Sequence, residues 1–263
     1  MSAADRPRLS VTVITLNEEA EIGECLASVA WADEIVVVDS GSADRTVEIA
    51  KKYTERVLYH EWPGYAAQKN WALGQASHDW VLSLDADERV APDLQAEIRE
   101  ALTAPAHAGY YIGRKNFFLG RWIRHGGWSP DYTIRLFDKR KGRFTEREVH
   151  EVVRLEGSAA TLKHPIEHYT YRSLAAYQER VGRYAALAAR EMRKKGRRFH
   201  AWDPVAHPLW TMFRMYFLRQ GFRDGIDGLL LAGLYGYYTF LKYAKLWEME
   251  LQDRAPDVGE RGR

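Results

Sequence analysis

The chain has 263 residues, of which 46% are hydrophobic and 28% charged, a composition typical of a globular protein with a sizeable core. Its 38 basic and 36 acidic side chains nearly cancel, so the charge gives no indication of a nucleic-acid partner. The single cysteine, Cys25, excludes an internal disulfide and is typical of a reducing compartment such as the cytoplasm.

Strand and helix patterns alternate through the first hundred residues. Apolar runs predict strands over 9–16, 34–39, 56–60 and 80–84. Helical spacing predicts helices over 19–30, 44–53, 65–76 and 92–102. Nearly continuous apolar strands separated by helices favour an α/β fold with a mainly parallel sheet covered on both faces. Ligands of such sheets bind at the carboxyl ends of the strands.

The remaining sequence predicts less regular strands and then helices. The segments GYYIGRKNFFLG, YTIRLFDK and VHEVVRLEG are expected to be strands, and the loop GRWIRHGGWSPD joins the first two. A helix is expected from residue 173 to about 195, and helical, aromatic sequence follows over 204–251. We therefore expect an α/β domain over residues 1–170, with halves over 1–104 and 105–170. A helical region over 171–251 and a flexible tail over 252–263 are expected to follow.

Two aspartates follow the fourth strand in the stretch WVLSLDADERV. Asp85 and Asp87 are two residues apart, so in an extended or turning backbone both side chains can point the same way. Two such carboxylates repel each other unless a cation lies beside them. Mg²⁺ or Mn²⁺ suits carboxylate ligands and commonly shares its shell with phosphate oxygens. A solvated surface turn is the alternative, but the end of a buried strand favours a metal site.

Polar residues also follow the other strands. Asp39 ends the second strand, and its carboxylate could accept hydrogen bonds from a nucleoside base or ribose, or could cap a strand-to-helix turn. Asn17 is predicted to cap the first helix, where Glu18 would favour the positive helix end. Lys69, on the third helix, is either a solvated lysine or a contact to a nucleotide. His168, in KHPIEHY, could complete a metal shell or be structural.

Four segments then carry a resemblance to a known family: SVTVITLNEEAEIGECLASV, EIVVVDSGSADRTVEIA, QKNWAL and WVLSLDADERV. They stand in the order found in family 2 glycosyltransferases, which have the GT-A fold. The later segments RLFDKRKGRF, VHE, HYTYRSLAAY and GFRDGIDGLLLA resemble one subgroup, the bacterial lipopolysaccharide-core glucosyltransferases of the cytoplasmic face of the inner membrane.

The resemblance implies a metal-dependent, inverting transferase with the nucleotide sugar in the half over 1–104 and the acceptor in the half over 105–170. The donor would be a UDP-sugar, with glucose as the sugar, and the acceptor a lipid-linked saccharide such as the lipopolysaccharide inner core. The resemblance implies that the uridine pocket is lined by Thr15, Asn17, Glu18 and Asp39. It also implies that Lys69 is a basic contact to the nucleotide, that Asp85 lies near the ribose and that Asp87 is the direct metal ligand.

An inverting transfer needs one general base to take the proton of the acceptor hydroxyl. Related enzymes carry this acid in a Glu-Asp pair after the later strands, and this sequence has no such pair. In an extended EVHEVV segment, Glu151 shares a face with two valines, where a carboxylate is costly to bury without a purpose. We therefore predict Glu151 as the base, with Asp131 and Glu148 as alternatives.

The segment from about residue 208 to 247 is apolar, aromatic and basic. Its uncharged run over 228–241 has 14 residues, which is shorter than the roughly 20 that a spanning helix needs. Rings beside Arg and Lys are typical of a helix in a membrane interface, and the basic run 190–198 would favour anionic lipid. The expected location is therefore cytoplasmic, peripheral on the inner membrane. A buried helical hairpin or a contact in a homo-oligomer is the alternative.

Two other functions are compatible with parts of this pattern. A nucleotidyltransferase also uses strand-end acids and a metal, but it usually has a Gly-rich basic loop after the first strand, where this chain has TLNEE. A non-catalytic carbohydrate-binding or membrane-binding protein would not need polar residues at the ends of three successive strands.

Overall fold

The structure, a computed structural model, describes residues 6–145 and 152–254. Glu148 and Glu151, two of the three predicted bases, lie outside these described residues. The chain divides into two compact units. The first comprises residues up to Lys115 together with Pro130–Tyr169, and the second comprises Asn116–Ser129 and the chain from Thr170 onwards. The segment Asn116–Ser129, which the sequence analysis puts in the α/β domain, therefore groups with the helical residues.

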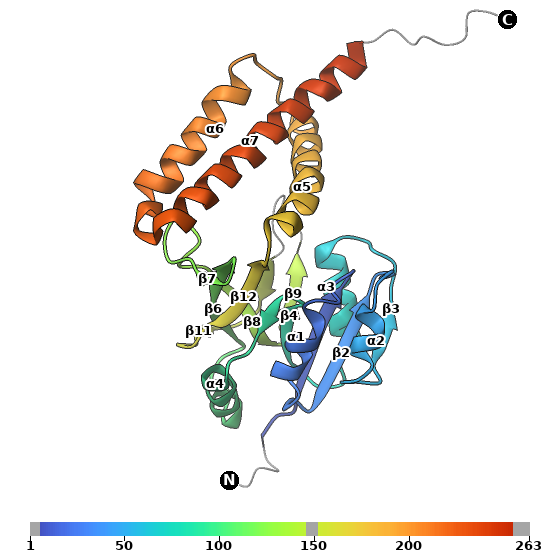
Figure 1. The fold of residues 1–263 in the computed structure, drawn as a ribbon. Helices are drawn as coiled ribbons and strands as arrows, with labels where there is room; N and C mark the ends of the chain where they lie inside the picture. The colour runs from blue at the N-terminus through green and yellow to red at the C-terminus, as the bar shows by residue number, and fades with distance from the viewer. Residues whose placement is uncertain (1–5, 146–151, 255–263) are drawn as a thin grey trace, which may run out of the picture. The chain divides into compact units, whose positions relative to one another are not determined.

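The first unit is built on a sheet whose strands follow the order β3-β2-β1-β4-β8-β6-β12-β5 (Figure 1). The first four strands of this order are parallel, and β8 then pairs antiparallel with both β4 and β6. The strand bounds are β1 Leu9–Thr15, β2 Glu34–Asp39, β3 Val57–Tyr59, β4 Trp80–Asp85, β5 Glu88–Arg89, β6 Gly109–Phe118, β8 Tyr132–Asp138 and β12 Ile166–Tyr171. Strands β7 (Arg121–Trp122) and β11 (Ala159–Thr161) pair with β6. The expected mainly parallel α/β sheet is confirmed.

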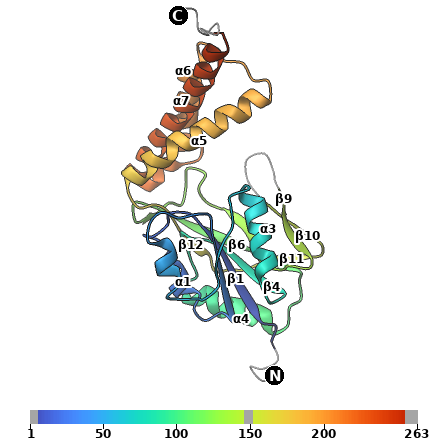
Figure 2. The same cartoon turned by 90° about the vertical axis from the view of Figure 1, so that its right-hand side faces the viewer.

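Helices cover both faces of the parallel strands because the buried side chains of these strands alternate between the faces. On one face, Val13, Val37 and Leu84 pack with α1 (Ile22–Ser28) and α4 (Pro92–Thr103). On the other face, Ile14 and Val38 pack with α3 (Tyr65–Gln75). Figure 2 shows α1 and α3 on opposite sides of β1. The short helix α2 (Thr46–Ala50) follows β2.

A separate hairpin of β9 (Gly142–Thr145) and β10 (Val152–Leu155) lies against α3. The side-chain amide of Asn70 on α3 donates to the carbonyl of Phe144 at 2.7 Å, and its oxygen accepts the Phe144 N–H at 2.9 Å. The Phe144 ring is buried against Phe137 of β8. The hairpin is thus held by both backbone hydrogen bonds and apolar packing.

The predicted cap of the first helix is wrong. The residue before α1 is Glu21, and it makes no side-chain capping bond. Asn17 instead has the left-handed φ of 57°, and its side-chain oxygen accepts the N–H of Ala43 at 2.8 Å. Asparagine tolerates this conformation better than most residues. Asn17 therefore links the loop after β1 to the loop after β2 and does not cap a helix.

The second unit consists mainly of helices. It contains α5 (Leu174–Lys194), α6 (Asp203–Phe213), the π-helical turn η1 (Arg214–Leu218), the 3₁₀ turn η2 (Gly221–Asp224) and α7 (Gly225–Arg254). Figure 1 shows α7 running beside α6 and α5. The Tyr177 hydroxyl on α5 donates to the Leu234 carbonyl of α7 at 2.5 Å. A Cβ on Gly236 would stand 2.6 Å from Met212 Cγ, so the glycine permits the close approach of α7 to α6.

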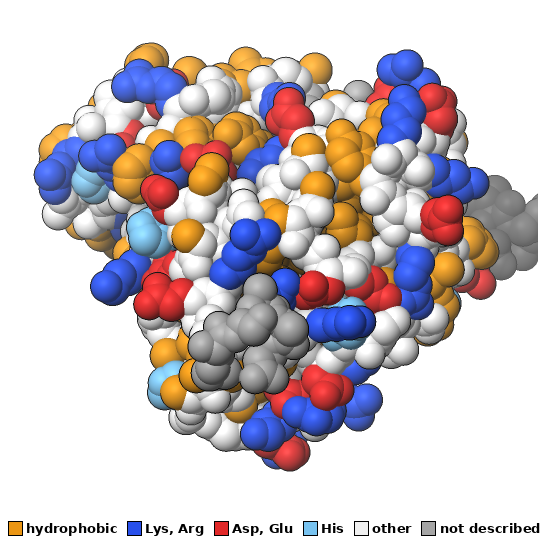
Figure 3. Space-filling view, turned by 90° about the horizontal axis from the view of Figure 1, so that it is seen from below, with side chains coloured by type: hydrophobic (Ala, Val, Ile, Leu, Met, Phe, Trp, Pro, Cys, Tyr) orange, Lys and Arg blue, Asp and Glu red, His pale blue; other side chains and the backbone are white. Residues whose placement is uncertain are grey.

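Among the described residues, no helix is both long enough and apolar enough to cross a bilayer. Many large apolar side chains of the second unit are nevertheless exposed, among them Leu209, Trp210, Phe213, Phe217, Leu218 and Phe222. Figure 3 shows one face of the molecule on which acidic and basic side chains are intermixed, in keeping with the nearly balanced charge of the chain.

Candidate active site

Three neighbouring strands of the first unit bring their carboxyl ends together. In the parallel register, Thr15 of β1 pairs with Asp39 of β2, and Ile14 of β1 pairs with Asp85 of β4. The polar residues that the sequence predicts at separate strand ends therefore share one edge of the sheet. This edge is where ligands bind in parallel α/β sheets.

Asp39 organises the turn that follows β2. One carboxylate oxygen accepts the N–H groups of Gly41 and Ser42 at 2.8 and 2.9 Å, and the other accepts the Ser42 hydroxyl at 2.5 Å. Gly41 has a φ of 95°, a conformation that favours glycine. A carboxylate can accept about four hydrogen bonds, so the turn leaves Asp39 capacity for one more donor. Its turn role and the predicted nucleoside role are compatible.

The loops after β1 and β2 are joined by hydrogen bonds. The N–H of Asn17 donates to the Ser42 hydroxyl and that of Glu18 to the Thr46 hydroxyl, both at 2.8 Å. Thr15 is the last residue of β1, and its hydroxyl is buried without a hydrogen-bond partner among the described residues. A buried hydroxyl that lacks a partner destabilises the fold, so this atom is available to a ligand.

Lys69 and Arg135 both bind Asp85. Lys69, which is 2% exposed, places Nζ 2.9 Å from Asp85 Oδ1, and Arg135 of β8 lies 2.7 Å from Asp85 Oδ2. Burial would raise the pKa of Asp85, but the two cations outweigh it and hold that pKa well below its usual value. Lys69 also lies 5.5 Å from the centre of the Phe144 ring. Asp85 is thus a half-buried anion with a cation on each oxygen.

Glu88 lies fully buried beneath this arrangement. It accepts the Asp85 N–H at 3.0 Å with one oxygen and binds Arg135 at 2.5 Å with the other. Burial raises the pKa of Glu88, and the neighbouring Asp85 charge acts in the same direction. Arg135 therefore bridges two acids, and Arg114, 3.8 Å from Glu88, adds a second positive charge.

Asp87 and His168 are brought together by the pairing of β5 with β12. His168 pairs with Glu88 across these strands, and the Tyr169 N–H donates to the Asp87 carbonyl at 2.9 Å. His168 Nε2 then lies 3.4 Å from Asp87 Oδ2. Burial alone would lower the pKa of His168, but the Asp87 charge and hydrogen bond raise it. His164, the other histidine of this segment, binds Glu97 at 2.9 Å instead.

The donor set fits a metal ion in part. Asp87 and His168 are adjacent and of ligand type, so they can supply two positions of a Mg²⁺ or Mn²⁺ shell. Asp85 does not fit as a direct ligand here, because both its oxygens are bound to cations. Within residues 6–145 and 152–254, no three His, Cys, Asp or Glu side chains gather as a metal cluster. The remaining positions would have to come from phosphate oxygens and water.

Asp131 is the one predicted base that the structure describes. Its carboxylate accepts two hydrogen bonds from Arg114, at 2.8 Å from Nε and 2.7 Å from a terminal nitrogen. Arg114 therefore occupies one face of the only predicted base that the described residues include.

The sequence analysis missed Glu88, Arg114, Arg135 and Gln68. Gln68 is fully buried on α3, and its amide donates to the Ser40 hydroxyl at 3.0 Å and to the His60 carbonyl at 3.2 Å. Arg135 could have been identified from the sequence, because it lies between Ile134 and Leu136 in a buried strand, where an unpaired charge is costly. Its partners, 50 and 47 residues away, carry no comparable sequence signal.

The chain is similar to proteins of one family along most of its length. The family profile described as glycosyl transferase family 2 matches residues 10–170. The lipopolysaccharide core biosynthesis glycosyltransferase LpsC of Rhizobium meliloti is 30% identical over 265 residues, which cover 96% of each chain. An uncharacterized glycosyltransferase of Rickettsia typhi is 30% identical and covers 94% of this chain and 89% of its own length. Among solved structures, S. aureus TarS with UDP-GlcNAc is 17% identical, with coverage of 94% and 92% and a TM-score of 0.48.

Proposed function

From the premise that this chain belongs to glycosyltransferase family 2, we propose that it transfers glucose from UDP-glucose to a lipid-linked saccharide of the lipopolysaccharide core. The name of the LpsC relative, which is similar over nearly the whole chain, supports the choice of acceptor class. The observation that carries the proposal is the shared strand edge, where Asp39, Asp85 and the Thr15 hydroxyl stand at the ends of three adjacent strands.

The loops after β1 and β2 would hold the uridine. Asp39 has capacity for one further donor, and the buried Thr15 hydroxyl is available to the base or ribose. Asn17 and Glu18 shape this wall through their hydrogen bonds to Ser42 and Thr46. Asp85 would orient the ribose, and Lys69 would balance its charge and that of the diphosphate.

Asp87 and His168 would hold a Mg²⁺ or Mn²⁺ ion together with the donor diphosphate. When bound, such an ion supplies Lewis-acid charge to the leaving phosphate oxygen. Glu151 would take the proton of the acceptor hydroxyl in a single displacement that inverts the anomeric centre, with Glu148 and Asp131 as alternatives.

We place the enzyme at the cytoplasmic face of the inner membrane, held by the second unit. Exposed apolar side chains on α6, η1 and η2 support a lipid contact, and Arg214, Arg219 and Arg223 stand among them. Rings and cations of this kind suit the boundary between headgroups and acyl chains.

The test is release of UDP from several UDP-sugars, with and without Mn²⁺, by the wild-type protein and Asp87→Asn. UDP-glucose should be the preferred donor, and both EDTA and Asp87→Asn should lower UDP release by a factor of about 100 or more. Asp93→Asn, which changes an exposed acid of α4, is the matched control and should keep wild-type release. Equal release by the Asp87 variant and the wild type would refute the metal assignment.

A further inference from the structure

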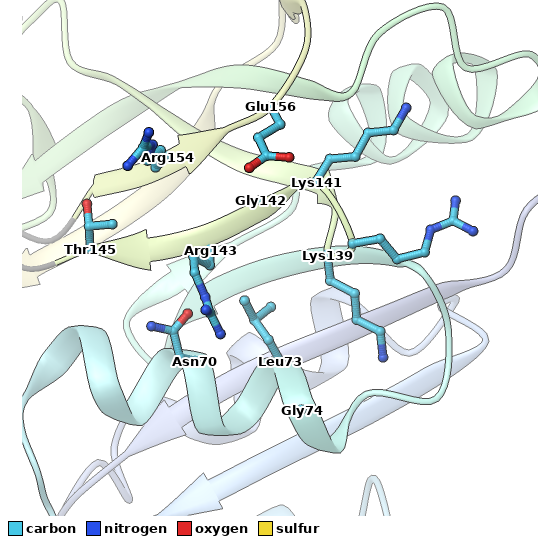
Figure 4. Close-up of a pocket in the computed structure, with 11 residues that line it drawn as sticks. Asn70, Leu73, Gly74, Lys139, Lys141, Gly142, Arg143, Thr145, Arg154 and Glu156 are labelled. Carbon is cyan, nitrogen blue, oxygen red and sulfur yellow. The ribbon is translucent and has the colours of Figure 1, made fainter.

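A cavity of about 640 Å³ lies in the first unit, between α3 and the β9–β10 hairpin (Figure 4). Its floor comes from α3, and its other walls come from the turn after β8 and from the hairpin strands. The lining residues that matter here are Lys139, Arg140, Lys141, Arg143, Arg154 and Glu156. Five cations and one carboxylate thus surround one space, in a chain whose total charge is nearly balanced.

Two of these cations already have partners in the fold. Lys139 Nζ donates to the Ala76 carbonyl at the end of α3, where a cation is favourable. Arg140 binds Asp138 at 2.6 Å and Asp79 at 2.9 Å. Both side chains therefore stabilise the wall of the cavity and are not counted as cations available to a ligand.

The other three cations differ from these two. Lys141, Arg143 and Arg154 are exposed, and none forms an ion pair with a carboxylate of the described residues. In Figure 4, Arg143 extends from β9 toward α3, between Asn70 and Leu73. Positive charge that is held in a concave site attracts anions more strongly than the same charge on a convex surface.

The frame that carries these charges is well fixed. Asn70 binds the backbone of Phe144 through two hydrogen bonds, so β9 cannot move away from α3 without breaking both. A Cβ on Gly142 would stand 2.6 Å from Phe137 Cδ2, so the hairpin lies in close contact with β8. A cavity whose walls are fixed before a ligand binds loses less entropy on binding.

The cavity extends away from the strand-end acids. The Lys139 N–H binds the carbonyl of Asp79, which precedes β4, whereas Asp85 stands at the other end of that strand. At about 3.3 Å per residue, this separates the Lys139 end of the cavity from Asp85 by roughly 20 Å. The cations that bind Asp85 are Lys69 and Arg135, and neither lines the cavity.

We propose that this cavity is a second anion site, which binds a phosphate-bearing ligand independently of the nucleotide sugar. Phosphate is the favoured anion because guanidinium groups bind it through two parallel hydrogen bonds, and two of the available cations are arginines. Leu73 and Gly74 give the floor an apolar part that a sugar ring or glycerol can cover. The phosphate belongs either to a soluble phosphate ester or to a lipid headgroup. This assignment does not depend on the proposed glycosyl transfer.

The test compares Arg143→Gln/Arg154→Gln with Arg8→Gln/Lys51→Gln, a control that removes two exposed cations elsewhere in the first unit. Binding of inorganic pyrophosphate is measured by calorimetry in EDTA. We expect the cavity variant to bind it at least about tenfold more weakly, since it loses the charge-assisted hydrogen bonds of two guanidinium groups. The control variant and Asp87→Asn should bind it as the wild type does. The melting temperature of each variant checks that the fold is intact.

A second arm identifies the source of the phosphate. Sedimentation with phosphatidylglycerol-containing vesicles should show weaker binding by the cavity variant if the ligand is a headgroup, and no difference between variant and wild type if it is a soluble ester. Pyrophosphate binding that is unchanged in the cavity variant, or that is lost in Asp87→Asn alone, would overturn the proposal.

Discussion

Lys69 Nζ lies 2.9 Å from Asp85 Oδ1, and Arg135 binds the other oxygen of the same carboxylate. The Lys69 side chain is only 2% exposed. The first aspartate of the strand-end pair is therefore neutralised by the protein itself. Asp87, which lies beside His168, is left as the aspartate that can face a metal ion. The two acids of this short stretch thus have different neighbours and are suited to different tasks.

Removing Lys69 should destabilise the first unit. Lys69→Met leaves the half-buried Asp85 with one cation instead of two, and breaking a buried ion pair costs about 3–5 kcal/mol. We expect the free energy of unfolding, measured in urea at pH 7, to fall by about 3 kcal/mol. Lys52→Met removes an exposed lysine that pairs with Glu48 and should change little. Equal losses in the two variants would contradict a special role for the buried pair.

Asp39→Asn should weaken UDP binding. An amide oxygen can still accept from the turn, but the negative charge that would hold a nucleoside donor is gone. We expect UDP affinity to fall about tenfold by calorimetry, equivalent to about 1.4 kcal/mol. Ser42→Ala is the comparison variant, because it removes the hydroxyl that donates to Asp39 and accepts from Asn17 but keeps the Asp39 carboxylate. If both variants bind UDP within twofold of the wild type, Asp39 serves the turn alone.

The parallel half of the fold could be predicted because its signals are local. The four central residues of EIVVVD are all apolar, the run is bounded by polar turns, and the structure has a strand over the same six residues. Strand β12 was missed because IEHYTY has neither a continuous apolar run nor a regular alternation of apolar and polar residues, and it pairs with distant residues such as those of β5. Local pattern carries little information about such long-range pairs.

The candidate site also has a part that could be predicted from the sequence and a part that could not. The carboxylates at strand ends could be placed from sequence, because parallel strands put their carboxyl ends on one edge. The cations that bind them could not, since Arg135 reaches Asp85 only after β8 has paired antiparallel with β4. Glu88 was visible in the sequence beside the aspartates, but its complete burial follows from packing between distant segments.

Glu34 should make stability depend on pH. Burial would raise the pKa of Glu34, but hydrogen bonds from Ser10, Ser77 and Arg56 outweigh it and lower that pKa from 4.5 to about 2. Because the folded pKa is the lower one, the stabilisation is complete above pH 4.5 and is lost as pH falls toward 2. At about 1.4 kcal/mol per pKa unit, it amounts to at most about 3.5 kcal/mol at pH 7.

The measurement for Glu34 is urea unfolding of the wild type and Glu34→Gln at pH 7 and pH 3. The difference in unfolding free energy should be largest at pH 7 and should shrink at pH 3. Glu48→Gln, which changes an exposed glutamate, should show no such trend. A difference that stays constant between the two pH values would contradict the ionic role of Glu34.

The rings of α6 and η1 should bind lipid. Trp210 stacks near Phe213 at 5.9 Å between ring centres, and Phe213 lies 5.3 Å from Phe217, so the three exposed rings form a continuous ridge. Trp210→Ser/Phe213→Ser/Phe217→Ser should lower the fraction of protein that sediments with anionic vesicles at least about tenfold, because each ring buries apolar area in the interface.

The control for this ridge is Tyr53→Ser/Trp62→Ser, which removes exposed rings from the first unit. It should sediment with vesicles as the wild type does. A different result would show that the ridge is instead a contact between copies of the chain. In that case the wild-type protein would not bind the vesicles and would elute as an oligomer, whereas the ridge variant would elute as a monomer.

The last prediction concerns the general base. Glu151→Gln keeps the size of the side chain and removes its basicity, so turnover should fall by a factor of about 100 or more while UDP-glucose binding stays unchanged. Asp131→Asn should have a smaller effect on chemistry, because that carboxylate already binds Arg114 at 2.7 Å. Steady-state rates and donor affinity are to be measured for these two variants and for Glu148→Gln on the same acceptor. If Glu151→Gln turns over at near the wild-type rate and Asp131→Asn or Glu148→Gln does not, the variant that loses turnover identifies the base. A loss of donor binding together with turnover in Glu151→Gln would instead indicate a role in holding the donor rather than in accepting the proton.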